Sequence, residues 1–226
     1  MNAAATLSAP AAAQQESYFS GERSELLALV PRGRRKVLDC GCGYGRLGAA
    51  LKARDGCRVV GLERDARAAA VARKHLDAVM EQDAEAPLNE RGFDCMLYGD
   101  ILEHLADPWG VLRAHAAALV PGGYVVLSVP NVRHFSVAWT LYARGRWRYA
   151  RSGILDRTHL RFFALADARE LVEQAGLVIE QVSANREPWS AKTVLVRLSY
   201  GLLVPDGLVV QWLMRARKPA GEETSK

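Results

Sequence analysis

Short apolar runs alternate with amphipathic runs along most of the chain. Runs with the length and β-branched content of strands lie at 36–40, 58–63, 78–82, 93–98 and 124–129. Runs with apolar residues at helical spacing lie at 22–30, 46–54, 66–76, 108–120 and 165–175. Two further strand-like runs, 177–182 and 208–215, complete the pattern. The alternation predicts parallel strands that are connected by helices.

The predicted architecture is a Rossmann-like, doubly wound α/β sheet. Its strands would be mostly parallel with an antiparallel last strand, and helices would cover both faces. Ligands of such sheets bind outside the carboxyl ends of the strands, so function is sought in the residues that follow each strand. Pro121, Gly122 and Gly123 are predicted to end the helix at 108–120. The apolar stretch 194–204 is predicted to be a helix that covers the sheet, and contact with a membrane is the alternative.

Composition bounds the domain organisation. With 226 residues, half of them apolar, the chain can bury one substantial core. We expect one domain at 16–217 between loose tails at 1–15 and 218–226. The Ala-rich start lacks the charged region and the apolar core of an export signal. Four irregularly spaced cysteines predict neither a disulfide framework nor a zinc motif. We therefore expect a cytoplasmic protein without a metal.

The first strand is followed by a glycine-rich turn, which reads V-L-D-C-G-C-G-Y-G at 37–45. Glycines let the backbone turn tightly and let a ligand lie against the main chain. Residues 43–48 also match the G-x-G-x-x-G fingerprint of NAD-binding proteins, with Glu63 where a ribose-binding acid belongs. Asp39, however, would repel a pyrophosphate, and Asp83 adds a third acid. An acidic rim favours a ligand that carries an ammonium and a sulfonium, such as S-adenosylmethionine (SAM).

Several motifs resemble those of class I SAM-dependent methyltransferases. The glycine-rich turn resembles their motif I. The run G-D-I-L-E-H-L-A-D-P at 99–108 resembles a motif of the subgroup that contains ubiquinone-pathway O-methyltransferases and MetW-like proteins. The block G-I-L-D-R-T-H-L-R-F-F at 153–163 resembles a signature of bacterial glycan-pathway methyltransferases. The resemblance covers about 18–188 and implies SAM as the cofactor and S-adenosylhomocysteine as the product.

The resemblance also implies individual roles on the cofactor side. Asp39 would face the ammonium of SAM. Glu63 would accept hydrogen bonds from the ribose hydroxyls, with a solvated loop acid as the alternative. Asp83 would meet the adenine amino group, with a solvated loop acid as the alternative. Tyr18 would be an aromatic lid, with an anchor for the first helix as the alternative. The expected cofactor-binding residues are Tyr18, Asp39, Gly41, Cys42, Gly43, Glu63, Arg64, Asp83, Ala84, Gly99 and Asp100.

Basic charge is concentrated in an insertion at 131–163. This segment holds seven arginines against one acid, Asp156, for a net charge of +6, although the whole chain carries only +5. The arginines could bind an anionic small acceptor, form a solvated face, or bind nucleic acid with the interleaved Trp147 and Tyr149. Because no nucleic-acid module accompanies them, we expect no nucleic acid as partner and interpret the insertion as the acceptor side.

His159 is the candidate general base, because imidazole titrates near working pH and Asp156 could orient it. A packing role for His159 is the alternative. His104 is the second candidate base, although its L-E-H context favours an architectural role. The predicted activity is O-methylation of a sugar, a glycan or another small acceptor by a monomer or homodimer. N-methylation and a non-catalytic SAM-binding regulator are the alternatives.

Overall fold

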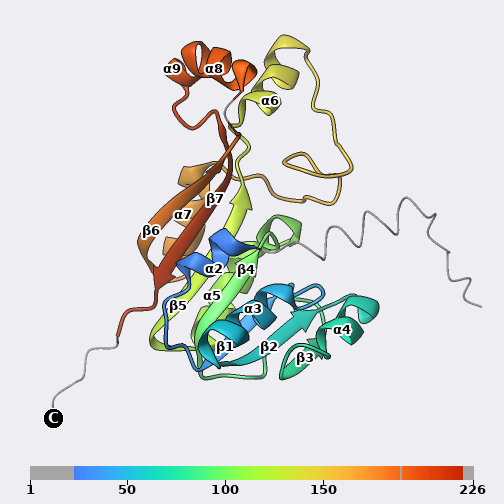
Figure 1. Cartoon of the computed structure of the whole chain (residues 1–226), viewed down its shortest axis with the longest axis vertical. Coiled ribbons are helices and arrows are strands. Elements are labelled where there is room, and N and C mark those ends of the chain that lie inside the picture. Colours follow the sequence, from blue (N-terminus) through green and yellow to red (C-terminus); the bar gives the residue numbers. More distant parts are fainter. Residues whose placement is uncertain (1–22, 189, 221–226) are drawn as a thin grey trace, which may run out of the picture.

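The computed structural model describes residues 23–188 and 190–220, which form one seven-stranded sheet with helices on both faces (Figure 1). Its strands are β1 (Lys36–Cys40), β2 (Arg58–Glu63), β3 (Ala78–Glu81), β4 (Phe93–Gly99), β5 (Leu119–Pro130), β6 (Val178–Arg186) and β7 (Val209–Arg217). They lie in the order β3-β2-β1-β4-β5-β7-β6. β7 is antiparallel to both β5 and β6, and the other neighbours are parallel. The predicted fold class is confirmed.

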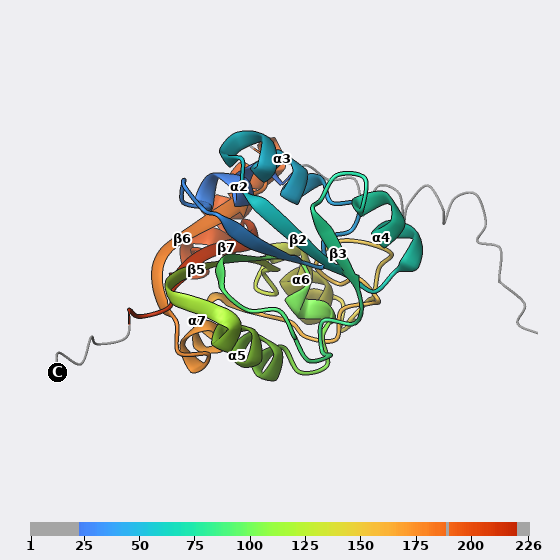
Figure 2. The same cartoon turned by 90° about the horizontal axis from the view of Figure 1, so that it is seen from below.

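Helices cover the sheet from two sides. α2 and α3 pack on one face and α5 and α7 on the other, as the view along the sheet shows (Figure 2). The helices of the main body are α2 (Ser24–Leu29), α3 (Arg46–Asp55), α4 (Ala66–Ala72), α5 (Pro108–Ala118) and α7 (Leu165–Gln174), with a short 3₁₀ turn, η1 (Leu102–His104). Beyond the body lie α6 (Phe135–Ala138), the π-helical turn η2 (Trp139–Ala143), α8 (Ala191–Leu198) and α9 (Tyr200–Leu203).

The central strands divide their side chains between two cores. Leu38 and Met96 belong to the core beneath α5 and α7, whereas their neighbours Val37 and Leu97 belong to the core beneath α2 and α3. This alternation is the two-residue period of a strand that is covered on both faces. Each of these side chains is fully buried, which stabilises the fold by roughly 1.5–3 kcal/mol per residue. The two cores hold the strand ends, and so the site, on a rigid platform.

The boundary between α5 and β5 differs from the prediction. α5 ends at Ala118, and the Pro121–Gly123 run lies inside β5 instead of ending the helix. Leu119 already pairs with Phe93, and the register then shifts before the regular part of the strand. The Lys218 ammonium bonds the carbonyl oxygens of Ala116 and Leu119, both at 2.7 Å. A cation at this position satisfies carbonyls that the end of a helix leaves unpaired.

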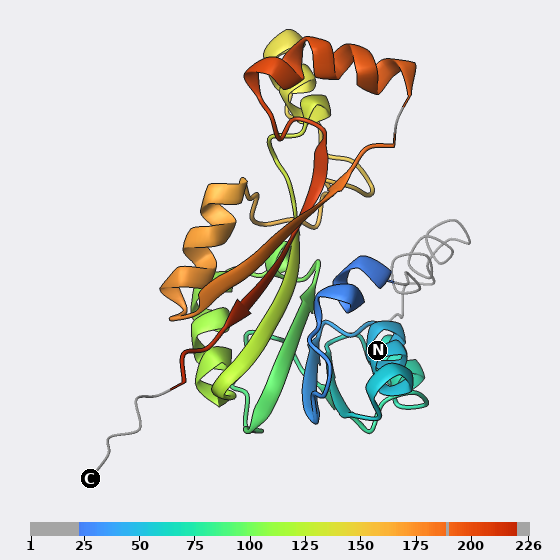
Figure 3. The same ribbon diagram turned by 60° about the vertical axis from the view of Figure 1, so that its left-hand side comes forward.

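The segment expected to cover the sheet does not do so. α8 and α9 stand beyond the ends of β6 and β7, beside α6 and away from both cores (Figure 3). The helix predicted at 194–204 therefore exists in two pieces, but its predicted position is wrong. Within the described part of the chain, every helix is too short or too polar to cross a membrane.

All four cysteines, Cys40, Cys42, Cys57 and Cys95, are free and buried. Burial raises the pKa of each thiol above its ordinary value. Thiolates react and bind metals far better than thiols do, so these side chains behave as small apolar residues. The expectation that they form no disulfide framework is confirmed.

Candidate active site

The turn after β1 requires glycine. Gly41, Gly43 and Gly45 have φ values of 70°, 53° and 77°, a left-handed conformation that other residues adopt at a cost. A Cβ atom at position 41 would also lie 2.9 Å from the side chain of Ile101, which follows β4. The turn therefore presents bare main chain at the point where β1 and β4 end.

Asp39 carries a buried carboxylate that forms no ion pair within 4.0 Å among the described residues. It lies in β1 directly before the glycine turn with 3% of its surface exposed. Its Oδ2 atom has no hydrogen-bond partner among the described residues. Burial raises the pKa of Asp39 to about 7, an effect that the nearby Arg23 guanidinium opposes and the Glu63 carboxylate reinforces. A ligand ammonium would satisfy this oxygen, as the predicted role of Asp39 requires.

Glu63 links the glycine turn to the next helix. One carboxylate oxygen accepts a hydrogen bond from the backbone N–H of Gly43 at 2.9 Å, and the other accepts one from Asp65 at 2.8 Å. Asp65 in turn caps α4 through the N–H groups of Arg67 and Ala68. An ionised carboxylate has about four acceptor sites, so two remain for the hydroxyls of a ribose. The side chain is buried, which excludes the alternative of a solvated loop acid.

The remaining predicted residues follow β1, β2 and β3, at the same edge of the sheet. Arg64 and Asp83 are exposed, and their side chains pair at 3.8 Å. Ala84 and Cys42 are buried. The Cys42 Sγ atom lies only 2.6 Å from where a Cβ of Gly61 would be, so a bare position in β2 accommodates it. Tyr18 lies outside the described residues.

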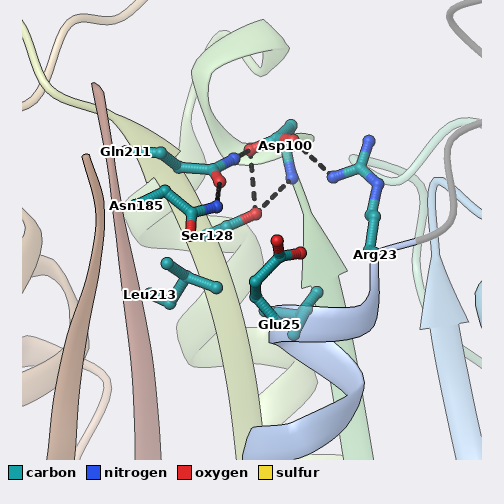
Figure 4. Close-up of a pocket in the computed structure, with 8 residues that line it drawn as sticks. Arg23, Glu25, Asp100, Ser128, Asn185, Gln211 and Leu213 are labelled. Carbon is teal, nitrogen blue, oxygen red and sulfur yellow. Dashed lines mark hydrogen bonds and ion pairs between the residues drawn. The ribbon is translucent and has the colours of Figure 1, made fainter. Parts of the chain in front are cut away.

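A polar network joins the ends of β4, β5, β6 and β7 (Figure 4). Asp100 accepts hydrogen bonds from the Ser128 hydroxyl at 2.8 Å and from the Gln211 amide, and it forms an ion pair with Arg23. The Gln211 carbonyl accepts a further bond from the Asn185 amide at 3.0 Å. With φ 51°, Asp100 is the one non-glycine residue of the described chain in the left-handed region. Such strain is concentrated at functional sites.

Sequence reasoning missed four members of this network, Arg23, Ser128, Asn185 and Gln211. Ser128 and Gln211 interrupt the apolar runs V-V-L-S-V and V-V-Q-W-L, and a polar residue inside a buried strand is a signal that could have found them. Arg23 carries no such signal. Its guanidinium lies across Gly99, where a Cβ would be 2.7 Å from one of its nitrogens, and it also influences Asp39.

The L-E-H turn contacts the arginine-rich insertion, which the sequence analysis interprets as the acceptor side. The carbonyl oxygen of Glu103 accepts hydrogen bonds from the N–H groups of Leu160 and Arg161 at 2.8 and 3.0 Å. The His104 ring bonds the Thr158 carbonyl at 3.2 Å. Two motifs that are about 50 residues apart in the sequence are therefore hydrogen-bonded to each other.

His159 lies inside this junction with 8% of its surface exposed. Its Nδ1 atom bonds the Ile154 carbonyl at 3.0 Å, which fixes the ring and directs Nε2 towards Glu103, 4.0 Å away. The Asp156 carboxylate bonds the N–H and hydroxyl of Thr158 instead. Ile154, and not Asp156, therefore orients the ring. The His104 and His159 rings meet edge to face at 4.8 Å.

Glu103 is fully buried, and neither carboxylate oxygen has a hydrogen-bond partner among the described residues. Burial, helped by the charge of Asp100, raises its pKa well above the ordinary value. Burial and then His159 lower the pKa of His104, so this imidazole is neutral at physiological pH. Donor atoms of Glu103, His104 and His159 lie within 4.8 Å of one another, a spacing that a divalent cation would also accept.

Comparison with known proteins agrees with this geometry. The family described as "Methyltransferase domain" matches residues 12–182. The ubiquinone biosynthesis O-methyltransferase of Xanthomonas axonopodis pv. citri (strain 306) is 32% identical over 190 residues, 77% of this chain and 78% of that protein.

Solved structures share the fold at lower identity. An S-adenosylmethionine dependent methyltransferase from Mesorhizobium loti has a TM-score of 0.63 and 22% identity, covering 88% of this chain and all of the other. A SAM dependent methyltransferase from Archaeoglobus fulgidus has a TM-score of 0.62 and 17% identity, covering 92% and 99%. The chain thus belongs to the class I SAM-dependent methyltransferases, enzymes that use SAM as their cofactor.

Proposed function

We propose that the enzyme transfers the methyl group of SAM to a hydroxyl oxygen of a small acceptor. The observation that carries this proposal is the pair of imidazoles, His104 and His159, beside the end of β4. A hydroxyl must lose its proton as it attacks, and a neutral imidazole can accept that proton. The relative from Xanthomonas is named an O-methyltransferase, which supports oxygen as the attacking atom.

The cofactor half of the site supplies position and charge. SAM provides an electrophilic methyl group whose bonding electron pair returns to sulfur. The buried Asp39 would bind the ammonium, Glu63 the ribose hydroxyls and Asp83 the adenine amino group. Arg23 is the cation within reach of Asp39 and Asp100, and it would bind the carboxylate of the methionyl part. Holding donor and acceptor in line contributes roughly 7–11 kcal/mol in well-oriented reactions.

On the acceptor side, His159 would take the hydroxyl proton while the new O–C bond forms. His104 lies against it and is the second candidate base. The displacement needs no Lewis acid, so we expect the reaction to proceed without a metal. Activity that is lost in EDTA and restored by Mg²⁺ would instead assign a metal to the cluster of Glu103, His104 and His159.

For the acceptor class we favour a sugar or glycan that carries an anionic group. The block at 153–163 holds His159 together with the exposed Arg157 and the half-buried Arg161. Guanidinium groups match phosphates and carboxylates in a two-point geometry. The name of the Xanthomonas relative gives a second class to test, acceptors of the ubiquinone pathway.

The test is a methyl-transfer assay with labelled SAM against nucleotide sugars, uronic acids and catechols. We expect turnover on an anionic sugar, with a kcat that falls about 100-fold or more in His159→Ala while the affinity for SAM is unchanged. His75→Ala changes an exposed histidine that belongs neither to the L-E-H turn nor to the insertion, and it is the control. Methylation of an amine would replace the hydroxyl proposal. SAM binding without turnover on any acceptor would favour a regulatory protein.

A further inference from the structure

The helices beyond the sheet form a projection, which we define as residues 135–143 and 191–203. It consists of α6, η2, α8 and α9 and stands beyond the carboxyl ends of β4 and β5, the end that carries the candidate active site (Figures 1 and 3). None of the residues proposed to bind SAM or to accept the hydroxyl proton belongs to this projection.

Large apolar side chains are exposed on the projection. Tyr142 is 85% exposed, Leu203 84% and Leu202 76%. Exposed residues of this kind are single and scattered on most soluble proteins, whereas a group of them marks an interaction site. The exposed members of the projection are Trp139, Leu141, Tyr142, Val194, Leu198, Leu202 and Leu203.

The two halves of the projection are connected to each other. The Tyr200 hydroxyl of α9 donates to the Arg133 carbonyl at 3.2 Å, and Arg133 forms an ion pair with Asp206 at 3.4 Å. The backbone N–H of Phe135, at the start of α6, bonds the Gly207 carbonyl at 2.8 Å. The two helical segments therefore stand together at the same end of the molecule (Figures 1 and 3), and their exposed side chains make up the surface of the projection.

Basic residues border this surface. Arg144, Arg146 and Arg148 follow η2 directly, and all three are exposed. In the part of the chain that the structure describes, none of the three has an acidic partner. Trp147 and Tyr149 alternate with them and are 37% and 51% exposed. Aromatic and apolar side chains next to unpaired cations are the composition of segments that lie in the interface of an anionic bilayer.

We propose that the projection docks on an anionic lipid surface. Its leucines and aromatic side chains enter the headgroup region, and the arginines at 144, 146 and 148 bind lipid phosphates. A second copy of the chain fits this surface less well, because it would bring a second arginine cluster to the same interface. Docked in this way, the protein holds its active-site end towards the membrane, where an acceptor carried by a lipid would reach it.

Vesicle binding tests the proposal. The full-length protein is sedimented with vesicles of phosphatidylcholine alone or with about one third phosphatidylglycerol. We expect binding only to the anionic vesicles, and weaker binding as salt increases. The double variant Leu202→Ser/Leu203→Ser and the triple variant Arg144→Glu/Arg146→Glu/Arg148→Glu should each bind about tenfold more weakly or worse.

Matched variants separate docking from general effects. Val178→Ser removes an apolar side chain that is 58% exposed on β6, outside the projection. Lys74→Glu/Arg113→Glu/Arg169→Glu reverses three exposed charges on other surfaces and changes the net charge equally. Both controls should bind vesicles like the wild type. All variants should retain their thermal unfolding midpoint and their affinity for SAM, because every substituted side chain is exposed.

Three results would overturn the proposal. One is wild-type protein that does not bind anionic vesicles, and another is equal binding to neutral and anionic vesicles. The third is a dimer in light scattering that Leu202→Ser/Leu203→Ser dissociates without any effect on lipid binding, which would assign the surface to a second copy. Vesicle binding is measured without substrate, so the docking proposal stands or fails independently of the acceptor proposal.

Discussion

Asp39 is a residue whose burial lowers the stability of the fold and places a carboxylate where SAM would bind. Its carboxylate is buried beside the glycine turn, one oxygen has no partner in the described chain, and its pKa is raised to about 7. A raised carboxyl pKa means that the folded state binds more protons than the unfolded state between about pH 4 and 7. Stability therefore falls as the pH rises through this window.

Asp39→Asn should separate stability from binding. At pH 8 the change removes an ionised buried carboxylate, so we expect the free energy of unfolding to increase by about 1–3 kcal/mol in chemical denaturation. SAM affinity, measured by calorimetry, should fall at least tenfold because the ammonium loses its counter-ion. In the wild type, SAM affinity should also fall as the pH drops below 7, and the variant should lose this dependence.

Asp94→Asn is the matched control. The Asp94 carboxylate accepts hydrogen bonds from the backbone N–H groups of Arg35 and Lys36 at 2.7 and 3.1 Å. Because Asn cannot replace both of these charge-assisted hydrogen bonds, the substitution should destabilise the protein. It should leave SAM binding unchanged. A stabilising Asp94→Asn, or a destabilising Asp39→Asn, would contradict this account.

The positions of residues relative to one another could be predicted where a motif carries them. The glycine turn, Asp39 and Glu63 lie together as the sequence indicated. Arg23 could not be predicted, because it reaches Asp100 across 77 positions of sequence. Gln211 reaches the same carboxylate across 111 positions. Such contacts depend on strand order, which local patterns do not specify.

At the scale of elements, the turn between β1 and α3 combines a left-handed backbone with a close neighbouring side chain. In Gly41→Ala an alanine must adopt φ 70°, and its Cβ atom would lie 2.9 Å from the Ile101 side chain. Gly33→Ala has a similar φ of 77° but has open space around its Cβ. We expect both variants to lose about 1 kcal/mol of unfolding free energy from the strained φ, measured by denaturant titration.

Only Gly41→Ala should lose more stability than this strain explains. It should also bind SAM at least tenfold more weakly, because the added carbon would displace the Ile101 side chain beside the glycine turn. If the two variants had equal effects on stability and on SAM binding, Gly41 would be required only for its positive φ and not for close approach of Ile101 or SAM.

Element prediction succeeded where burial determines the pattern. The bounds of β1 and β2 agree with the sequence, since both strands are covered on two faces. The end of α5 was misplaced because Leu119 and Val120 suit a strand as well as a helix, and pairing with Phe93 decides between them. α8 and α9 were misplaced because apolar residues such as Leu198, Leu202 and Leu203 suit a core-facing pattern, yet these three side chains are exposed.

At the scale of the whole molecule, one buried pair links pH to global stability. The Tyr98 hydroxyl and the His115 Nδ1 atom form a 2.9 Å hydrogen bond between β4 and α5, and both side chains are buried. Burial lowers the pKa of His115 to about 4. The unfolded chain takes up this proton near pH 6.5, so the contribution of His115 is complete above that value and declines as the pH falls towards 4.

His115→Gln should remove this dependence. Denaturant titrations at pH 7.5 and 4.5 should show that the wild type loses up to about 3 kcal/mol more than the variant between the two values. The difference between the two proteins is the relevant quantity, because Asp39 contributes with the opposite sign. A variant with the same pH profile as the wild type would show that His115 is protonated in the folded state.

The concealed thiols make the chain a convenient host for chemical labels. Because all four native cysteine thiols are buried and have raised pKa values, a maleimide should leave the folded wild type unmodified. A single cysteine introduced as Tyr142→Cys, at a position 85% exposed, would then be the only reactive site. A polarity-sensitive fluorophore attached there would report insertion into lipid by a blue shift of its emission. The rate at which the native thiols are slowly labelled would measure how often the core opens.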